Sequence, residues 1–301
     1  MEINIPINEE MIKEKQELIA SLKKDALVQS FLASKQLDET IVEQFPFRIQ
    51  KGVANLRKCE GCTGLDACTQ PLKGQVNALS YDGILRLEPR LCAFASAYKQ
   101  ERAHLSRFWI NQMPEHLKTV SIKQIDQSKE GADYLRALAE VTMNLIQPEQ
   151  GLFLYGAVGT GKTYLAGCIA NYFARKGQSV VFVQTPGWIS KMKGMFNDPD
   201  NFERELEMMK KASVVILDDI GAESVTSWVR DELLFPILNE RMENHRLTYF
   251  TSNEELSTLE EHYAYTSMGE EKMKAVRMME RIKKLSKPVE IKGKNRRFSE
   301  E

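Results

Sequence analysis

The sequence lacks several features that mark broad classes of protein. No apolar run approaches the length needed to cross a bilayer, and the N-terminal segment MEINIPINEEMIKEKQELIA carries acidic residues and lysines where a signal peptide has an apolar core. The formal net charge of the 301 residues is only -1, so no overall positive field draws the whole protein onto nucleic acid. These absences predict a cytoplasmic protein that does not act in a membrane.

Cysteine is also scarce, with five residues, but four of them fall in one short region. In a reducing compartment such a cluster indicates a metal site rather than a disulfide framework. Cys59 and Cys62 have the C-x-x-C spacing of a metal-binding knuckle, and Cys68 and Cys92 can complete a tetrahedral Zn²⁺ site. Zinc is favoured over an iron–sulfur cluster because no motif for a redox partner is present. Cys168 lies in an apolar helical stretch and fits a buried thiol without a ligand.

Hydrophobic periodicity changes along the chain. Residues 9–36 have the apolar spacing of an amphipathic helix, residues 57–95 are rich in turn-forming residues and predict turns with short strands, and residues 93–109 are helical in pattern. A further helix ends near Ile146, because Pro148 follows it.

From Gly151 onward, short apolar runs alternate with helical segments, which predicts an α/β fold with a mainly parallel sheet covered by helices. The five expected strands are GLFLY, SVVFVQ, SVVILDD, LTYFTSN and PVEIK. The expected organisation is a small helical, zinc-binding domain over 1–105, a linker over 106–125 and the α/β domain over 126–301.

The segment GAVGTGKT, which follows the first of these strands and precedes a helix, fits a phosphate-binding loop. Its glycines leave room for backbone N–H groups to converge on phosphate oxygens. Lys162 supplies a positive charge at the β- and γ-phosphates, and Thr163 supplies a hydroxyl for Mg²⁺. The alternative, a glycine-rich turn before an ordinary helix, does not account for the strand–loop–helix setting. The expected nucleotide contacts are Gly156, Gly159, Thr160, Gly161, Lys162 and Thr163.

Polar side chains follow two other predicted strands. Asp218 and Asp219 end the run VVILDD, and Asn253 ends LTYFTSN. The carboxyl ends of parallel strands are where such sheets bind ligands. We therefore expect Asp218 to hold Mg²⁺, and Asp219 to orient the attacking water together with Asn253.

These elements together resemble the Walker A, Walker B and sensor 1 motifs of AAA+ P-loop ATPases. The segment LDDIGAESVTSWVRDELLFPILNERM (217–242) resembles bacterial helicase loaders of the DnaI type, and more distantly loaders of the DnaC type. The cysteine region is similar to the zinc-bearing domain that DnaI-type loaders place ahead of the ATPase, so the resemblance covers nearly the whole chain. It implies an ATP-dependent loader that binds the replicative DNA helicase through residues 1–105. It also implies that the ATPase domain binds single-stranded DNA, and that the loader forms a homo-oligomer on the helicase.

Two positions depart from the pattern of the family. Many AAA+ proteins carry Glu after the Walker B Asp, whereas this chain has Asp219, whose shorter side chain predicts slow hydrolysis. The family's zinc site can include a His between the second and last cysteines. Here Val76 stands in that region and the nearest His is His104, so the predicted ligand set is all cysteine.

Arginines near the C-terminus match further positions of the family. Arg277 and Arg281 lie four residues apart, hence on one helix face. Arg281 best matches the arginine finger that acts on a neighbouring subunit's γ-phosphate, and Arg296 or Arg297 matches sensor 2. The alternative is that these arginines only solvate a helix face.

Two segments are candidates for contact with DNA. Residues 272–297 hold eleven lysines and arginines but few acids, which can follow a phosphate backbone. In PGWISKMKGMF, Trp188 and Phe196 can stack on single-stranded bases, but their helical spacing fits core packing better.

Two other functions fit the phosphate-binding loop. One is a related AAA+ helper ATPase for DNA transposition. The other is a small-molecule kinase, which needs an arginine-bearing lid that the sequence does not show and leaves the cysteine region without a role.

Overall fold

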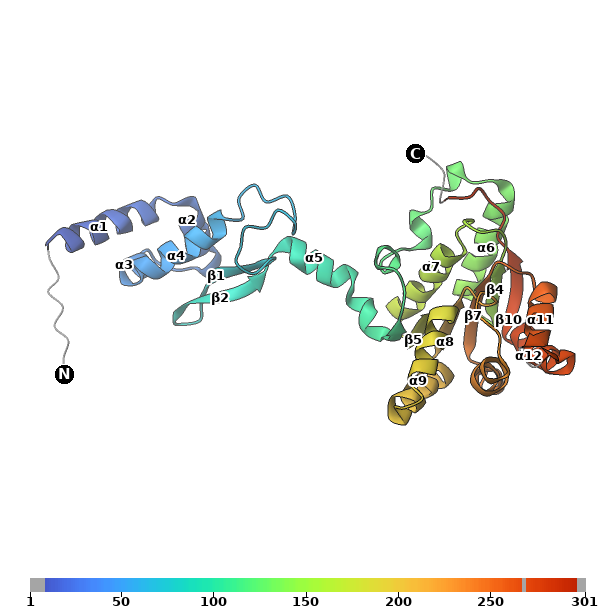
Figure 1. Cartoon of the computed structure of the whole chain (residues 1–301). Coiled ribbons are helices and arrows are strands. Elements are labelled where there is room, and N and C mark those ends of the chain that lie inside the picture. Colours follow the sequence, from blue (N-terminus) through green and yellow to red (C-terminus); the bar gives the residue numbers. More distant parts are fainter. Residues whose placement is uncertain (1–8, 267–268, 297–301) are drawn as a thin grey trace. The chain divides into compact units, whose positions relative to one another are not determined.

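The computed structural model describes residues 9–266 and 269–296, and the chain folds as two compact units that divide between Glu101 and Arg102 (Figure 1). Each unit has its own hydrophobic core. Among the described residues, no helix is both long and apolar enough to span a bilayer.

The first unit packs four helices against a two-stranded hairpin. The helical structure predicted over 9–36 is confirmed, but it is divided into two helices. The break falls at Asp25, whose side chain accepts a hydrogen bond of 2.9 Å from the N–H of Leu27 and caps the second helix. The hairpin confirms the short strands predicted within 57–95. The elements are α1 (Glu9–Lys23), α2 (Ala26–Lys35), α3 (Thr40–Gln44), α4 (Pro46–Arg57), β1 (Gln75–Tyr81), β2 (Leu85–Leu91) and α5 (Ala93–Glu101).

The core of this unit is small and aliphatic. It joins the helices to the inner face of the hairpin, where Leu79 and Leu85 are buried. The other buried members are Leu22, Val28, Leu32, Ile41, Val42, Ile49 and Val53.

The second unit is a six-stranded parallel sheet covered by helices on both faces (Figure 1). Its strands are β3 (Phe108–Asn111), β4 (Gly151–Tyr155), β5 (Val180–Gln184), β6 (Val214–Asp218), β7 (Leu247–Ser252) and β10 (Ser286–Glu290). Its main helices are α6 (Ala132–Ile146), α7 (Lys162–Arg175), α8 (Thr185–Gly194), α9 (Pro199–Lys211), α10 (Phe235–Glu243), α11 (Leu256–Ala264) and α12 (Lys272–Leu285). Shorter pieces are η1 (Ala103–Arg107), η2 (Glu115–Leu117), η3 (Ile122–Gln124), η4 (Gln127–Lys129), the π-helix η5 (Trp228–Leu234), β8 (Tyr265–Thr266) and β9 (Gly269–Glu270).

The sheet has the strand order β10-β4-β7-β6-β5-β3, and every neighbouring pair is parallel. Alternate residues of each strand enter opposite cores. In β4, for example, Leu152 and Leu154 pack with α6 and α7, whereas Phe153 packs with the helices of the other face. The predicted α/β class and its five strands are confirmed, with the last strand beginning two residues earlier than PVEIK.

The sixth strand, β3, is not among the five that the sequence predicts. The helix predicted over 93–109 ends at Glu101, and Phe108–Asn111 pairs with β5 at the edge of the sheet. The segment expected to be a linker over 106–125 therefore contributes a strand to the larger unit, which begins at Arg102. Four residues at an edge carry too short a pattern to be separated from the preceding helical one.

Candidate nucleotide-binding site

Three strands, β4, β6 and β7, bring their carboxyl ends to one edge of the sheet, and a cavity of about 1080 Å³ opens there. This is the edge at which open parallel sheets bind ligands. The predicted residues on its wall are Gly159, Gly161, Lys162, Thr163, Asp218, Asp219 and Asn253.

The loop after β4 needs glycine for conformation and for space. Gly156 and Gly159 have φ values of 143° and 84°, which L-residues other than glycine rarely adopt. A Cβ on Gly156 would lie 2.6 Å from the carbonyl oxygen of Ile291, and one on Gly159 would lie 2.1 Å from Oδ1 of Asn295. The loop is therefore enclosed by the chain that follows β10; a larger residue at Gly156 would meet the backbone of Ile291, and one at Gly159 would be strained by its positive φ and would displace the Asn295 side chain.

Lys162 is the first residue of α7 and is only 7% exposed. Its ammonium group donates hydrogen bonds of 2.8 Å to the carbonyl oxygens of Gly156 and Ala157. The lysine thus curls back over the loop, where its charge and the N-terminus of α7 both favour an anion.

Asp218 ends β6 and is almost completely buried. Its carboxylate accepts a hydrogen bond of 2.7 Å from the hydroxyl of Thr251 and another from Thr163. Burial raises the pKa of Asp218, and these hydroxyl donors act in the opposite direction. The Thr163 hydroxyl and the Asp218 carboxylate are therefore adjacent, and such oxygen ligands are those that Mg²⁺ prefers.

Asp219 adopts the left-handed conformation, with φ of 59°. Its N–H donates to the hydroxyl of Thr251 at 2.8 Å, and its carboxylate accepts a hydrogen bond of 3.0 Å from the side-chain amide of Asn253. Non-glycine residues in this region of φ/ψ are uncommon and are found at functional sites. The two residues predicted to orient a water molecule are thus brought together.

Thr251 forms hydrogen bonds with both aspartates, yet no sequence pattern distinguishes it from other strand threonines. It lies two residues before Asn253 on β7, the strand next to β6. The strand order, which places β7 between β4 and β6, is the signal that sequence alone does not supply.

Arg296 also lines the cavity, whereas Arg281 does not. Arg281, on α12, packs its guanidinium 4.7 Å from the ring centroid of Phe235 and donates to Asn239 Oδ1 at 3.3 Å. The other candidate for sensor 2, Arg297, lies outside the described residues.

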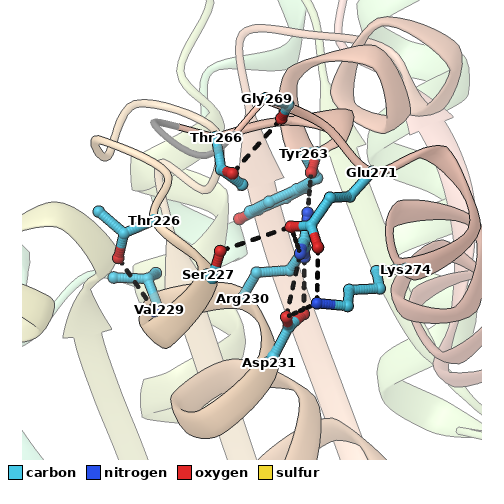
Figure 2. A network of polar contacts seen from close by, with 10 residues as sticks. All are labelled: Thr226, Ser227, Val229, Arg230, Asp231, Tyr263, Thr266, Gly269, Glu271 and Lys274. Carbon is cyan, nitrogen blue, oxygen red and sulfur yellow. Dashed lines mark hydrogen bonds and ion pairs between the residues drawn. The ribbon is translucent and has the colours of Figure 1, made fainter.

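The family-like segment 217–242 is tied to α12 by a polar network (Figure 2). Arg230, in the π-helix η5, has no exposed surface and donates to both carboxylate oxygens of Asp231, to Glu271 and to the carbonyl of Tyr263. Lys274 pairs with the same two carboxylates, at 3.1 Å from Asp231 and 2.6 Å from Glu271. The buried guanidinium is thereby compensated by charge and by hydrogen bonds, which burial of an arginine requires.

The four clustered cysteines do not form a metal centre in the structure. Among the described residues, no three His, Cys, Asp or Glu side chains are grouped so as to hold a metal ion. Three of the sulfurs instead accept N–H hydrogen bonds, and the one from Gly74 lowers the pKa of Cys68. The distances are 3.2 Å to Cys59 from Gln70, 3.3 Å to Cys68 from Gly74 and 3.4 Å to Cys92 from Ala95.

The basic segment 272–297 is largely neutralised by acids. Over its described part, 272–296, seven lysines and arginines have carboxylates within ion-pair distance: Lys272, Lys274, Arg281, Lys283, Lys287, Lys292 and Arg296.

The two aromatic candidates for base stacking differ in burial. Trp188 is completely buried, so its core interpretation is confirmed, whereas Phe196 is 60% exposed. The Phe196 ring lies edge-on to Trp228, with 5.0 Å between centroids.

Comparison with known proteins identifies the family. The model for the family described as IstB-like ATP binding protein matches residues 69–301. The replicative helicase loader DnaI of Bacillus subtilis (strain 168) is 32% identical over 300 residues, which cover 96% of this chain and 93% of that protein. The chain belongs to the DnaI-type helicase loaders.

Two further comparisons cover parts of this loader. A crystal structure of DnaI superposes with a TM-score of 0.55 and 34% identity, covering 62% of this chain and 98% of that one. An ATP-binding protein of insertion sequence IS1162 from Pseudomonas fluorescens is 31% identical over 113 residues, or 38% of this chain and 48% of that protein. The predicted membership of the DnaI-type loaders, with an ATP-binding α/β domain, is confirmed.

Proposed function

We propose that this loader binds the replicative DNA helicase and, switched by ATP, helps to place it on single-stranded DNA. The observation that carries the proposal is the extent of the match to the Bacillus loader, which spans both units. Co-purification of the full chain with the replicative helicase of the same cell tests it. Failure of the two proteins to associate with or without Mg-ATP would contradict it.

For the nucleotide site we propose binding of Mg-ATP with slow hydrolysis. The loop 156–161 and Lys162 would hold the phosphates, while Thr163 and Asp218 would ligate Mg²⁺, which neutralises phosphate charge when bound. Asp219 and Asn253 would orient water, and the short arm of Asp219 makes the ATPase a slow switch.

The helicase contact is proposed for the first unit, which has its own core and contains no part of the nucleotide cavity. A fragment of residues 1–101, checked for folding by circular dichroism, should retain the helicase, and a fragment of 102–301 should not. Retention by the second fragment alone would reverse the assignment.

Single-stranded DNA is proposed to contact the second unit at Phe196. Its exposed ring is supported by Trp228, and stacking of one base on such a ring contributes about 1–3 kcal/mol. The ion pairs along 272–297 reduce the charge that this segment offers to phosphates. Phe196→Ala should weaken binding of an oligonucleotide, while the control Tyr265→Ala, also at an exposed aromatic, should not. Equal effects of both would remove Phe196 from the interface.

We also propose that the first unit masks this DNA contact until the helicase engages. The fragment 102–301 should then bind single-stranded DNA more tightly than the full chain at the same salt concentration. Equal affinities would remove the masking step.

Arg281 is proposed to act on the nucleotide of a neighbouring copy within an oligomer formed on the helicase. Two observations support this role. Arg281 does not line the nucleotide cavity of its own chain, and its guanidinium is held by contacts with Phe235 and Asn239.

A helper ATPase for DNA transposition is the second candidate, because the IstB-like model matches residues 69–301 and the IS1162 protein is similar over 113 residues. The two functions differ in partner. Association with a transposase but not with the helicase would favour the helper function.

A further inference from the structure

The chain that follows β10 runs along the phosphate-binding loop. The N–H of Ile291 donates to the carbonyl of Tyr155 at 2.7 Å, and the N–H of Arg296 donates to the carbonyl of Gly159 at 3.0 Å. The side chain of Asn295 lies against Gly159. The backbone of Arg296 is therefore fixed to the loop that would hold the phosphates.

The side chain of Arg296 is held by two residues from another part of the sequence. Its guanidinium lies 2.8 Å from Oε2 of Glu130 and 4.4 Å from the ring centroid of Tyr134, the buried tyrosine of α6. All three residues line the nucleotide cavity, and the guanidinium nitrogen Nε is 3.3 Å from where a Cβ on Gly161 would be.

This ion pair differs in position from its neighbours. Lys287 pairs with Glu140 and Lys292 with Glu290, and none of these four residues lines the cavity. The carboxylate of Glu130 is only 15% exposed, so it adds a negative charge to the wall of a site that must receive an anion. A carboxylate in this position repels the phosphates of a nucleotide, unless the arginine paired with it is the group that contacts them.

We propose that Glu130 is the counter-ion that holds the guanidinium of Arg296, the sensor 2 candidate, when nucleotide is absent, and that it gives up this guanidinium to a phosphate when nucleotide binds. Carboxylate and phosphate both match the planar fork of arginine, so they compete for one group. Tyr134 supports the guanidinium from its face and leaves the N–H edge available for exchange. Glu130 thereby sets the nucleotide affinity without touching the nucleotide. This proposal rests on the proposed nucleotide site.

The test is a double-mutant cycle on the full chain with Mg-ATP, measured by isothermal titration calorimetry at fixed ionic strength. Glu130→Gln removes the competitor and should tighten ATP binding about two- to fivefold, the range for a partly exposed ion pair. Arg296→Gln should weaken binding, and Glu130→Gln should then have no further effect in the Arg296→Gln background.

Two controls make the cycle decisive. Glu140→Gln makes the same chemical change in an ion pair outside the cavity, so it should leave ATP affinity unchanged. A general field effect of Glu130 would instead tighten binding equally with and without Arg296, and that result would overturn the proposal. So would an unchanged or weaker affinity of Glu130→Gln.

The experiment also distinguishes an error in the proposed nucleotide site from an error in the proposed role of Glu130. If the unmodified chain does not bind ATP, or if Lys162→Ala binds it equally well, the nucleotide site is wrongly placed. If Lys162→Ala abolishes binding but the cycle shows no coupling, only the exchange between Glu130 and phosphate is wrong. Thermal unfolding without nucleotide checks that each variant is folded.

Discussion

The side-chain amide of Asn253 donates to the carboxylate of Asp219 over 3.0 Å, joining the ends of two neighbouring parallel strands. An amide donor fixes which carboxylate oxygen remains available to a water molecule. We predict that Asp219→Asn keeps ATP affinity but lowers the hydrolysis rate about 10²–10⁴-fold, as expected for loss of a general base. Asn253→Ala should lower the rate with little change in affinity. Single-turnover hydrolysis and equilibrium binding separate the two quantities, and a large loss of affinity in both variants would contradict these roles.

Lys162→Ala should abolish ATP binding, because its ammonium group is the buried cation at the phosphate-binding loop. Lys176→Ala, at the other end of the same helix, is the matched control and should bind ATP normally. Calorimetric titration measures both. Unchanged ATP affinity in Lys162→Ala would place the phosphates elsewhere.

Arg281→Ala should leave ATP affinity nearly intact and slow hydrolysis only when the loader is assembled on the helicase, by up to about 10³-fold. Arg277→Ala, one turn earlier on α12, is the control. Hydrolysis is measured with and without helicase. A loss of ATP affinity in the isolated loader would mean that Arg281 acts on its own nucleotide.

Stability should depend on pH through Glu223. Burial raises the pKa of this carboxyl above 4.5, while the hydroxyl of Tyr263, which donates to it, acts in the opposite direction. A raised pKa in the folded state means that the folded protein holds the proton more tightly, so stability falls as pH rises through that pKa. Thermal unfolding between pH 4 and 8 should show this decline, and Glu223→Gln should lack it. Tyr263→Phe should move the decline to higher pH; an identical profile for all three proteins would contradict the assignment.

The four cysteines are not grouped around a metal position in the structure, so the zinc site predicted from their spacing requires them to close on the ion. If they do, protein purified without chelator should contain one Zn²⁺ per chain, and chelation should unfold the first unit. Cys62→Ser should lose the metal, whereas Cys168→Ser, at the buried thiol of α7, should retain it. Elemental analysis measures the content. Absence of stoichiometric zinc in the unmodified protein would rule out the site.

Sequence predicted the parts of the site that are continuous in the chain. The loop 156–163 and the acidic end of β6 carry their chemistry locally, because a strand, a turn and a helix follow one another within a few residues. Thr251 and Glu130 could not be selected in this way, since each acts on a partner from a distant segment.

The sequence also could not predict which of two apolar side chains in one segment is buried. Trp188 lies within α8 and is buried, whereas Phe196 follows the end of that helix and is exposed, although the apolar spacing continues from one to the other. The break at Asp25 shows the same limit for helices, because a cap of one residue interrupts an apolar spacing that continues across it.

The edge strand β3 has a practical consequence for work with isolated parts of the loader. A fragment that begins at residue 126 lacks β3 and leaves the buried strand VVFV of β5 as the new margin of the sheet. Unpaired N–H and C=O groups on such an apolar strand are a template for pairing with another molecule. Aggregation of that shorter fragment would therefore report a missing strand, and ATPase fragments should start at Arg102.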